Sequence, residues 1–355
     1  MTVVHPVPSR WMRHSRQERV LIILIPTRSF RQVQISDTLY ALDRQIIAAL
    51  QVNARASFPA IASALREQER TVARRAQRLL DTGAVRLTAF VDELKTGLGQ
   101  PVSLRISVRP GSTDAVADAL SARPDTRAVM AVTGDADICC ELVAADKPTL
   151  HRVLNTDLPA ITGLRHTRTY AVLHHVKPTS AWQLPVLTSA QTRLLRRPRA
   201  RSQDGGRLQL SSDDLELLEA LRGNARCSYV DLAGQLGVTA TTVRRRLDRM
   251  LTSGAVSLRA SVEPELLGLR IEADVWLRVR PDSIAKTAAQ LARRSEVTYC
   301  GVVTGSYGLE LILALPDLDQ LHSFIADVIA AQPAVLDSEP TLVTRTYKRG
   351  YLRTS

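Results

Sequence analysis

The sequence has few cysteines, and they form no covalent or metal-binding framework. Its four cysteines, Cys139, Cys140, Cys227 and Cys300, include no C-x-x-C pair. Cys139 and Cys140 are neighbours in an expected strand, so their side chains point to opposite faces and cannot share a metal ion. The seven histidines form no H-E-x-x-H motif and lack carboxylates at ligand spacing. We therefore expect buried thiols in a reducing cytoplasm, no metal site and no cofactor.

The sequence also lacks the common catalytic signatures and a membrane-spanning run. No Ser-His-Asp order, P-loop or nucleotide-binding glycine motif is present, so neither covalent nor phosphoryl-transfer chemistry is indicated. The apolar run Val20–Ile25 is too short to cross a bilayer. The residues after it, Pro26 to Arg28, offer no small-residue cleavage site. Residues 1–36 are interpreted as a basic N-terminal extension, and no membrane partner is predicted.

Positive charge is what the sequence has in excess. The chain of 355 residues carries a formal net charge of +12, and its pI is near 10.1. This length predicts two or more domains. The charge favours a polyanionic partner, which could be DNA, RNA or an acidic membrane surface. Much of the excess is arginine, whose planar guanidinium suits phosphates and guanine edges.

A long internal repeat organises the chain. The stretch "NARASFPAIASAL" (Asn53–Leu65) is echoed by "NARCSYVDLAGQL" (Asn224–Leu236), at an offset of 224 − 53 = 171 residues. The same offset takes Thr133-Gly134 to Thr304-Gly305 and Lys177 to Lys348 without a gap. A register held over this distance indicates a duplicated unit of about 140 residues.

Each copy divides into two parts with different periodicity. Residues 37–86 and 210–257 each show three apolar-periodic helices, with Gly237 at the tight turn before the third helix of copy two. Residues 87–177 and 258–350 alternate strand and helix in the order βαββαβ, which predicts a four-stranded antiparallel sheet with both helices on one face. Residues 178–209 form a basic linker, whose arginines either lie against phosphates or belong to a solvated tether.

The third helix of each copy combines an apolar stripe with a basic face. On a helical wheel, Val243, Leu247, Met250 and Leu251 of "TTVRRRLDRM" and its continuation fall on one side. The counterparts in copy one are Val72, Ala76, Leu79 and Leu80. The third helix of a helix-turn-helix enters the major groove, so we interpret the basic face as a contact to double-stranded DNA and not only as a solvated surface. The candidate DNA-binding residues are Arg70, Thr71, Arg74, Arg75, Arg78, Thr239, Thr241, Thr242, Arg244, Arg245, Arg246 and Arg249.

This order of parts resembles the Lrp/AsnC, or feast/famine, family of transcriptional regulators. The matching features are the helix-turn-helix, Gly-Ala-Val leading into a short strand, and βαββαβ with "TG-x-x-(D/G)" between the middle strands. The resemblance covers about 38–177 and 210–350. It implies an α+β fold with two winged-helix-type helix-turn-helix domains and two ferredoxin-like domains of the dimeric α/β-barrel type. It further implies an intrachain pseudo-dimer, homo-oligomers and a small-molecule effector such as an amino acid.

The two copies differ in ways that predict a division of labour. Copy one has Arg66 where copy two has Gly237, and a residue other than glycine at positive φ costs about 1 kcal/mol. Copy one also places Glu67 and Glu69 near its third helix, where they would repel phosphates. Copy two is therefore expected to be the better DNA reader.

The sensor turns differ in the opposite sense. Copy one reads "TGDAD" and copy two "TGSYG", so only copy one offers carboxylates to an ammonium group. The alternative is that both turns simply connect strands. The candidate effector-binding residues are Gly134, Asp135, Asp137, Gly305, Ser306 and Tyr307.

Two other functions remain open at this point. Siroheme decarboxylases resemble the same two-part architecture and occur as fused pairs. However, His166, His174 and His175 of copy one are replaced in copy two by Asp337, Arg345 and Thr346, and the cationic helix argues against an enzyme. The third possibility is an architectural DNA binder without an effector. The sequence thus predicts a DNA-binding regulator and no enzyme.

Overall fold

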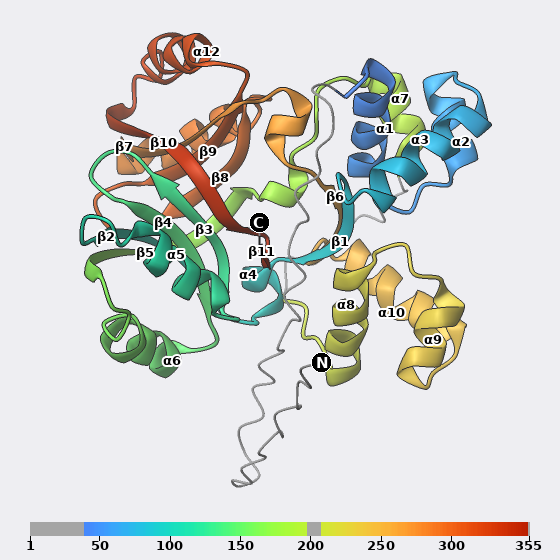
Figure 1. The fold of residues 1–355 in the computed structure, drawn as a ribbon, viewed down its shortest axis with the longest axis horizontal. Helices are drawn as coiled ribbons and strands as arrows, with labels where there is room; N and C mark the ends of the chain where they lie inside the picture. Colours follow the sequence, from blue (N-terminus) through green and yellow to red (C-terminus); the bar gives the residue numbers. More distant parts are fainter. Residues whose placement is uncertain (1–38, 197–206, 354–355) are drawn as a thin grey trace, which may run out of the picture.

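The computed structural model describes residues 39–196 and 207–353. The expected N-terminal extension (1–36) and the centre of the expected linker (197–206) lie outside the described residues. Figure 1 shows a barrel of strands and helices on one side and two helical units on the other, joined by a narrow ribbon of two strands.

Each copy begins with three helices, as predicted. They are α1 (Ala41–Val52), α2 (Phe58–Leu65) and α3 (Glu69–Asp81) in copy one, and α8 (Ser212–Gly223), α9 (Tyr229–Leu236) and α10 (Ala240–Thr252) in copy two. The hydroxyls of Ser57 and Ser228 cap the second helices by accepting first-turn amides that have no helical partner. Both second helices end in the left-handed region, at Arg66 (φ 59°) and Gly237 (φ 64°). This conformation turns the chain into the third helix.

The second part of each copy has the predicted βαββαβ order. Copy one contains β2 (Gln100–Val108), α5 (Thr113–Ala122), β3 (Thr126–Val132), β4 (Ile138–Ala144), α6 (Lys147–Arg152) with a π-helical continuation to Asp157, and β5 (Leu164–Lys177). Copy two contains β7 (Ile271–Val279), α11 (Ile284–Leu291), β8 (Val297–Val303), β9 (Leu309–Leu315), α12 (Leu318–Ser323) with a π-helical continuation to Ile329, and β10 (Val335–Arg349). Alternate strand residues pack against the helices in two separate apolar cores.

Long last strands join the two sheets into one closed barrel. β5 pairs with β2 through Ala171 and then with β8 from Val172 onward. β10 likewise pairs with β7 through Leu342 and then with β3 from Val343 onward. The nine-stranded sheet of the described residues therefore closes on itself, with the two-residue β11 (Leu352–Arg353) left as an appendage to β10. The predicted pseudo-dimer within one chain is confirmed.

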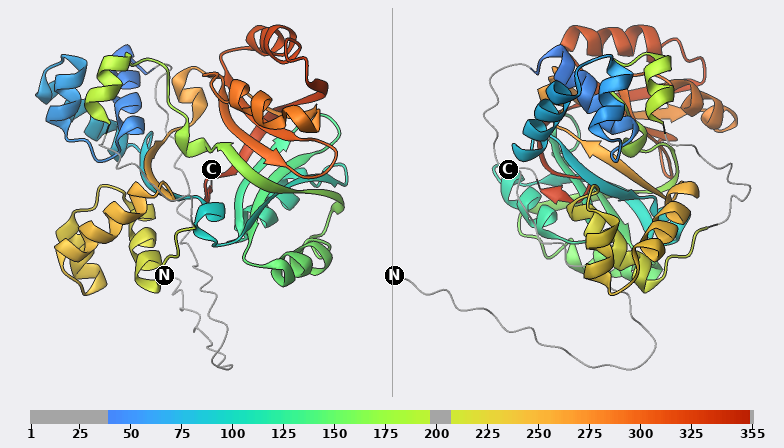
Figure 2. Two further views of the ribbon diagram at one scale, coloured as in Figure 1. Left: turned by 180° about the vertical axis from the view of Figure 1, so that it is seen from behind. Right: turned by 90° about the vertical axis from the view of Figure 1, so that its right-hand side faces the viewer.

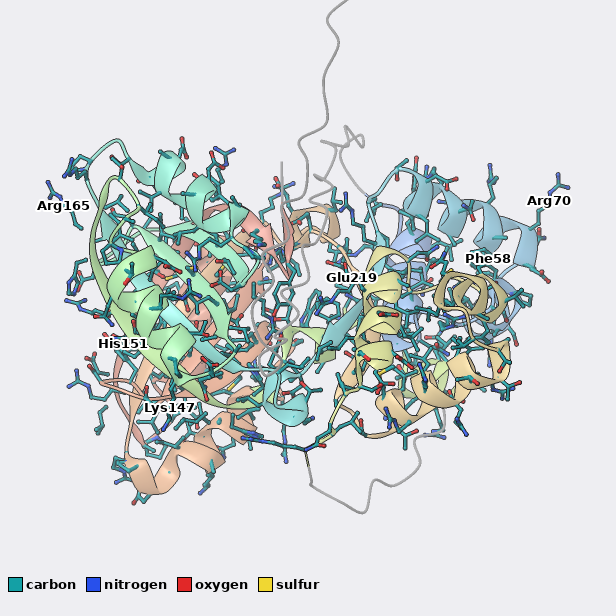
Figure 3. The ribbon with its side chains drawn as sticks, turned by 90° about the horizontal axis from the view of Figure 1, so that it is seen from below. Phe58, Arg70, Lys147, His151, Arg165 and Glu219 are labelled. Carbon is teal, nitrogen blue, oxygen red and sulfur yellow. The ribbon has the colours of Figure 1, made fainter. Side chains whose placement is uncertain are left out.

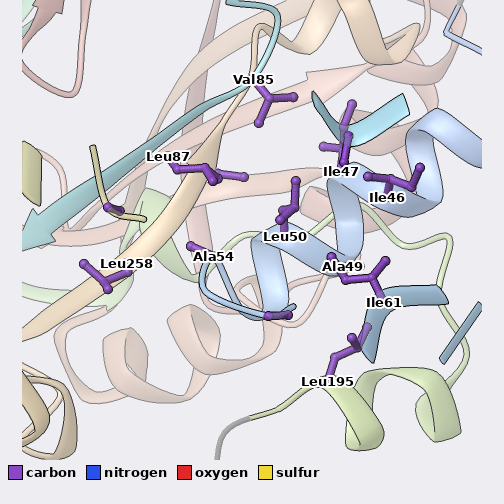
Figure 4. Close-up of a cluster of buried hydrophobic side chains, with 14 of the residues drawn as sticks. Ile46, Ile47, Ala49, Leu50, Ala54, Ile61, Val85, Leu87, Leu195 and Leu258 are labelled. Carbon is purple, nitrogen blue, oxygen red and sulfur yellow. The ribbon is translucent and has the colours of Figure 1, made fainter. Parts of the chain in front are cut away.

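A second contact between the copies lies between the helical units. The strand after each third helix, β1 (Arg86–Val91) or β6 (Val256–Ser261), pairs with its counterpart in the other copy. Apolar side chains of both helical units share one core, and Figure 4 shows Leu258 of copy two near Leu87 and Ala54 of copy one. Both copies therefore contribute to one helical body, which faces the viewer in the right-hand view of Figure 2.

The expected linker contains an ordered helix, α7 (Ser189–Leu195), beside α1 and α2. Buried Leu195 packs in the helical core, and its carbonyl accepts a hydrogen bond from the side-chain amide of Asn53 at 3.1 Å. Upstream, Trp182 is also buried and donates from its indole to the carbonyl of Ser295 at 2.8 Å. The segment before residue 197 therefore packs on both the helical body and the barrel.

Candidate nucleic-acid interface and sensor turns

The third helices carry the predicted basic faces. The residues buried in them are Val72, Ala76 and Leu79 in α3, and Val243, Leu247 and Met250 in α10. Arg74 and Arg245, which occupy the same position in the repeat, are exposed and form no hydrogen bond or ion pair with any described residue. Figure 3 shows Arg70, at the start of α3, extending outward at the side of the molecule away from the barrel.

Two candidate arginines of α3 already have a carboxylate partner. Arg75 and Arg78 lie 3.2 and 3.0 Å from the oxygens of Asp43 in α1, whose side chain is fully buried. A buried carboxylate is costly without a cation, so this pair holds α3 against α1. These two arginines are thus weaker candidates for phosphate contact than Arg74.

Copy two has a similar arrangement, but its two arginines pair with two neighbouring aspartates instead of one. Arg249 of α10 is paired with Asp214 of α8, whose side chain is 1% exposed. Arg246 lies 2.6 Å from the neighbouring Asp213. Asp43 and Asp214 occupy the same position in the repeat, and this match was the sequence signal for the pairs.

The start of α10 is built from two of the predicted threonines. The hydroxyl of Thr239 caps the helix by accepting the amide of Thr242 at 3.2 Å, and the two hydroxyls lie 2.9 Å apart. Thr241 and Arg244 are exposed, and Arg244 lies 3.7 Å from Asp248 one turn along. Thr71, near the start of α3, is half-buried.

Two arginines outside the predicted interface residues join the helical units reciprocally. Arg55 donates to the carbonyls of Ala225 and Cys227 at 2.8 and 3.0 Å. Its repeat counterpart Arg226 donates to the carbonyls of Ala54 and Ala56 at 3.2 and 2.8 Å. We call Arg55 and Arg226 the arginine clasp. Both arginines occupy the third position of the repeated "NAR", which was the sequence signal for their equivalent roles.

Each clasp arginine also lies over an aromatic ring of the opposite unit. The guanidinium carbon of Arg55 is 4.6 Å from the ring centroid of Tyr229, and that of Arg226 is 4.8 Å from the ring of Phe58. These are cation–π distances. The clasp therefore sets how one third helix is placed relative to the other.

Both sensor turns lie where the long strands pass from one copy to the other. In copy one, the amide of Thr133 donates to the carbonyl of Leu342, and its hydroxyl accepts the Leu342 amide, each at 2.9 Å. Thr304 and Ala171 repeat this pattern at 3.0 and 2.8 Å. Gly134 and Gly305 have φ of 94° and 89°, as the turns require. The turns therefore fasten each copy to the other.

The polar groups of the two turns are not equivalent. The Asp137 carboxylate accepts the amide of Val108 at 2.8 Å and so holds its own turn. Asp135 is exposed, and its side chain has no hydrogen-bond partner among the described residues. Ser306 is exposed. Asp135 is thus the carboxylate left available to an ammonium group in this turn.

The Tyr307 side chain contacts other protein side chains and is only partly exposed to solvent. Its hydroxyl donates to Glu339, which also receives two bonds from buried Arg105. The hydrogen bond from the Arg105 guanidinium lowers the pKa of Glu339 below its ordinary value. The ring packs near Trp276 and Tyr170, so Tyr307 closes one end of the barrel.

Residues 39–196 and 207–353 contain neither a candidate metal site nor a candidate membrane-spanning helix. No group of three or more His, Cys, Asp or Glu side chains in these ranges could hold a metal ion. No helix in them is long and apolar enough to cross a bilayer. Three of the four cysteines are buried, and burial raises the pKa of the Cys140 and Cys300 thiols to about 12.

Two family descriptions match the chain, each of them twice. The AsnC-type helix-turn-helix domain matches residues 41–80 and 210–251. The Lrp/AsnC ligand binding domain matches residues 102–182 and 272–352. The matches follow the boundaries between the helical units and the barrel.

Individual proteins match one copy or the whole fold. The HTH-type transcriptional regulator Ptr1 of Methanocaldococcus jannaschii is 33% identical over 138 residues, which are 39% of this chain and 93% of Ptr1. Regulatory protein AsnC of Escherichia coli is 29% identical over 132 residues, 37% of this chain and 87% of AsnC. The crystal structure of the siroheme decarboxylase NirDL covers 88% of this chain and 94% of its own, with a TM-score of 0.58 and 14% identity, a likeness of fold alone. The chain belongs to the Lrp/AsnC family of transcriptional regulators and carries the two-domain unit of that family twice.

Proposed function

We propose that this protein binds specific double-stranded DNA sites mainly through α10 and that a small metabolite modulates this binding. It acts in the cytoplasm, as the pseudo-dimer or as a homo-oligomer of it. The observation that carries the proposal is the basic face of α10, where Arg244 and Arg245 remain exposed after Arg246 and Arg249 are engaged by α8. Exposed arginines on a third helix are placed to contact phosphates and base edges.

Copy two is favoured over copy one as the principal reader. Gly237 reaches φ 64° without strain, whereas Arg66 occupies φ 59° with a side chain. Glu67 and Glu69 are both exposed at the entry to α3, where their charges oppose phosphate. The α10 helix has no carboxylate in its first turn.

The test is a pair of matched arginine variants on one operator. The operator is first selected from a random double-stranded library with the full chain. Arg245→Ala should weaken binding by about 1–3 kcal/mol, roughly fivefold to a hundredfold, and Arg74→Ala should weaken it less. Arg165→Ala removes the same charge from an exposed site on the barrel and serves as the control. Equal losses of affinity for the Arg245 and Arg74 variants would contradict the asymmetry between the copies. No loss of affinity in either variant would contradict DNA recognition by α3 and α10.

For the effector, the sensor turn of copy one is the proposed site. Asp135 is the proposed partner of an ammonium group, such as that of an amino acid. Asp137 is less suited because its carboxylate already accepts the Val108 amide. Losing one partner of a charged hydrogen bond weakens binding roughly tenfold to a hundredfold. A thermal-shift screen of amino acids on wild type, Asp135→Asn and Ser306→Ala is the assay. A response lost only in Ser306→Ala would move the site to copy two.

The likeness to NirDL keeps one alternative worth testing, a fused enzyme of the siroheme decarboxylase type. That protein shares this fold at 14% identity. Siroheme added to the purified chain should leave its Soret band unchanged if the protein is a regulator, and a shift would favour the enzyme. An effector-independent architectural DNA binder would respond to neither siroheme nor any amino acid.

A further inference from the structure

The two ends of the barrel differ. One end is filled by Tyr170, Trp276 and Tyr307, whose ring centroids are 4.7 to 6.1 Å apart. The other end faces the β1–β6 ribbon, and a cavity of about 120 Å³ lies between them. Its walls include Glu310 and Tyr299 from the barrel and Ala260 and Ser261 from the ribbon.

Two arginines in the wall of this cavity are paired with carboxylates. Arg127 lies 3.0 Å from Glu93 and 3.3 Å from Glu141. Arg349 lies 2.6 Å from Glu272 and 3.4 Å from Glu263. The other two cations of the wall, Lys348 and Arg259, donate to the main-chain carbonyls of Arg123 and Val52, at 2.7 and 3.1 Å. A bound anion would therefore compete with carboxylates and carbonyls for these donors.

Glu310, in contrast, has no ion-pair partner within residues 39–196 and 207–353. Its side chain is 7% exposed, and its only hydrogen-bond partner among the described residues is the Ser103 hydroxyl, at 2.6 Å. Arg105, whose charge acts on this carboxyl, is paired with Glu339. Fully buried Asp274 adds a second carboxylate and is bonded to the Trp276 indole. The barrel interior thus holds two carboxyl groups whose ionisation is costly unless a cation is bound beside them.

A second observation points to a missing polar partner in the same wall. The Tyr299 hydroxyl is buried and has no hydrogen-bond partner among the described residues. Buried polar groups in proteins nearly always have a partner, either in the protein or in something bound to it.

We propose that this cavity binds a small primary ammonium compound, with the ammonium group against the Glu310 carboxylate. An engineered cavity of about 150 Å³ accommodates benzene, so a cavity of 120 Å³ limits the ligand to at most about six non-hydrogen atoms. This site is distinct from the turn at Asp135. Its counterpart position in copy one is Cys139, so the duplicated chain has one such carboxylate rather than two.

The location of the cavity allows a bound ligand to affect the position of α10. Ala260 and Ser261 line the cavity and belong to β6, which begins at Val256, shortly after α10 ends at Thr252. A ligand held between barrel and ribbon favours whichever placement of the ribbon fits it better. This regulation rests on the proposed DNA binding, whereas the binding site itself does not.

Protonation supplies an additional signature. Burial, and then the charge of Asp274, raise the pKa of Glu310 well above its ordinary value. The other groups that act on its carboxyl are Ser103, Arg105 and Glu141. An ammonium ligand stabilises the ionised carboxylate, so its binding should release a proton and tighten as pH rises.

The experiment is calorimetric titration of the full chain, without DNA. Ethylamine, ethanolamine, putrescine and L-alanine are compared with ethanol, ethylene glycol and propionate, which lack the ammonium group. At least one amine should bind, and the matched alcohols and acid should not. Glu310→Gln should weaken amine binding at least about tenfold and abolish its rise with pH. Glutamine has the shape of the protonated carboxyl and can still accept the Ser103 hydrogen bond, so this variant should fold.

Two further variants separate the sites. Ala128→Leu fills the cavity wall and leaves Glu310 in place, so it should abolish binding through size alone. Asp135→Asn should leave amine binding at the cavity unchanged. Absence of heat for every amine, or wild-type affinity in Glu310→Gln, would overturn the proposal. Because no DNA is present, failure here is distinguishable from failure of the proposed DNA binding.

Discussion

Removing one arm of the arginine clasp should loosen the two helical units from each other. Arg226→Ala deletes hydrogen bonds of 3.2 and 2.8 Å to two carbonyls and a ring contact at 4.8 Å. Charged hydrogen bonds contribute about 1.5–3 kcal/mol each, and a partly exposed cation–π contact about 0.5–1 kcal/mol. Burial and then the charge of Arg55 lower the pKa of Arg226, so desolvation and repulsion offset part of this gain. We expect a net loss of about 2–3 kcal/mol.

The measurement is urea unfolding of the full chain followed by circular dichroism. Arg55→Ala should give a similar loss, and Arg193→Ala, an exposed arginine of α7, should give about none. The two clasp arginines repel each other, so the double variant should lose more than the sum of the single losses. Losses below about 0.5 kcal/mol in both single variants would show that the clasp geometry is incidental. If the units loosen, the preferred spacing of operator half-sites should also broaden.

Three further outcomes follow from strained or buried groups. Arg66→Gly should stabilise the chain by up to about 1 kcal/mol in thermal unfolding, and Gly237→Ala should destabilise it by a similar amount, because both sites need positive φ. Asp274→Asn should raise stability at pH 7, because burial raises the pKa of this carboxyl from 3.8 to about 6. Between these two pKa values the native state binds a proton that the unfolded state has lost, so wild-type stability falls as pH rises from about 4 to 6. The stability advantage of the Asn variant, at most about 3 kcal/mol, should therefore vanish below pH 4. The measurement is the unfolding midpoint of both proteins across that pH range. A constant difference between the two midpoints would refute this prediction.

Local periodicity was enough to predict the elements and the exposed part of the candidate interface. The stripe of Val243, Leu247 and Met250 is buried as the helical wheel predicted, because a helix fixes which side chains share a face. The positive φ at Gly237 and Gly305 follows from turns that other residues enter only with strain. The repeat likewise predicted the paired sensor domains, since each sheet alone leaves one face uncovered.

Tertiary structure decided which polar residues are engaged and which are available. Arg246 and Arg245 are adjacent in sequence, yet one is ion-paired to Asp213 and the other is exposed. Glu310 stands among alternating residues of "LELILAL", a pattern equally suited to a strand with one wet face. Barrel closure buries that face instead. Contacts across the pseudo-dimer join residues about one repeat apart, as between Arg55 and Ala225, and no local periodicity encodes such a contact.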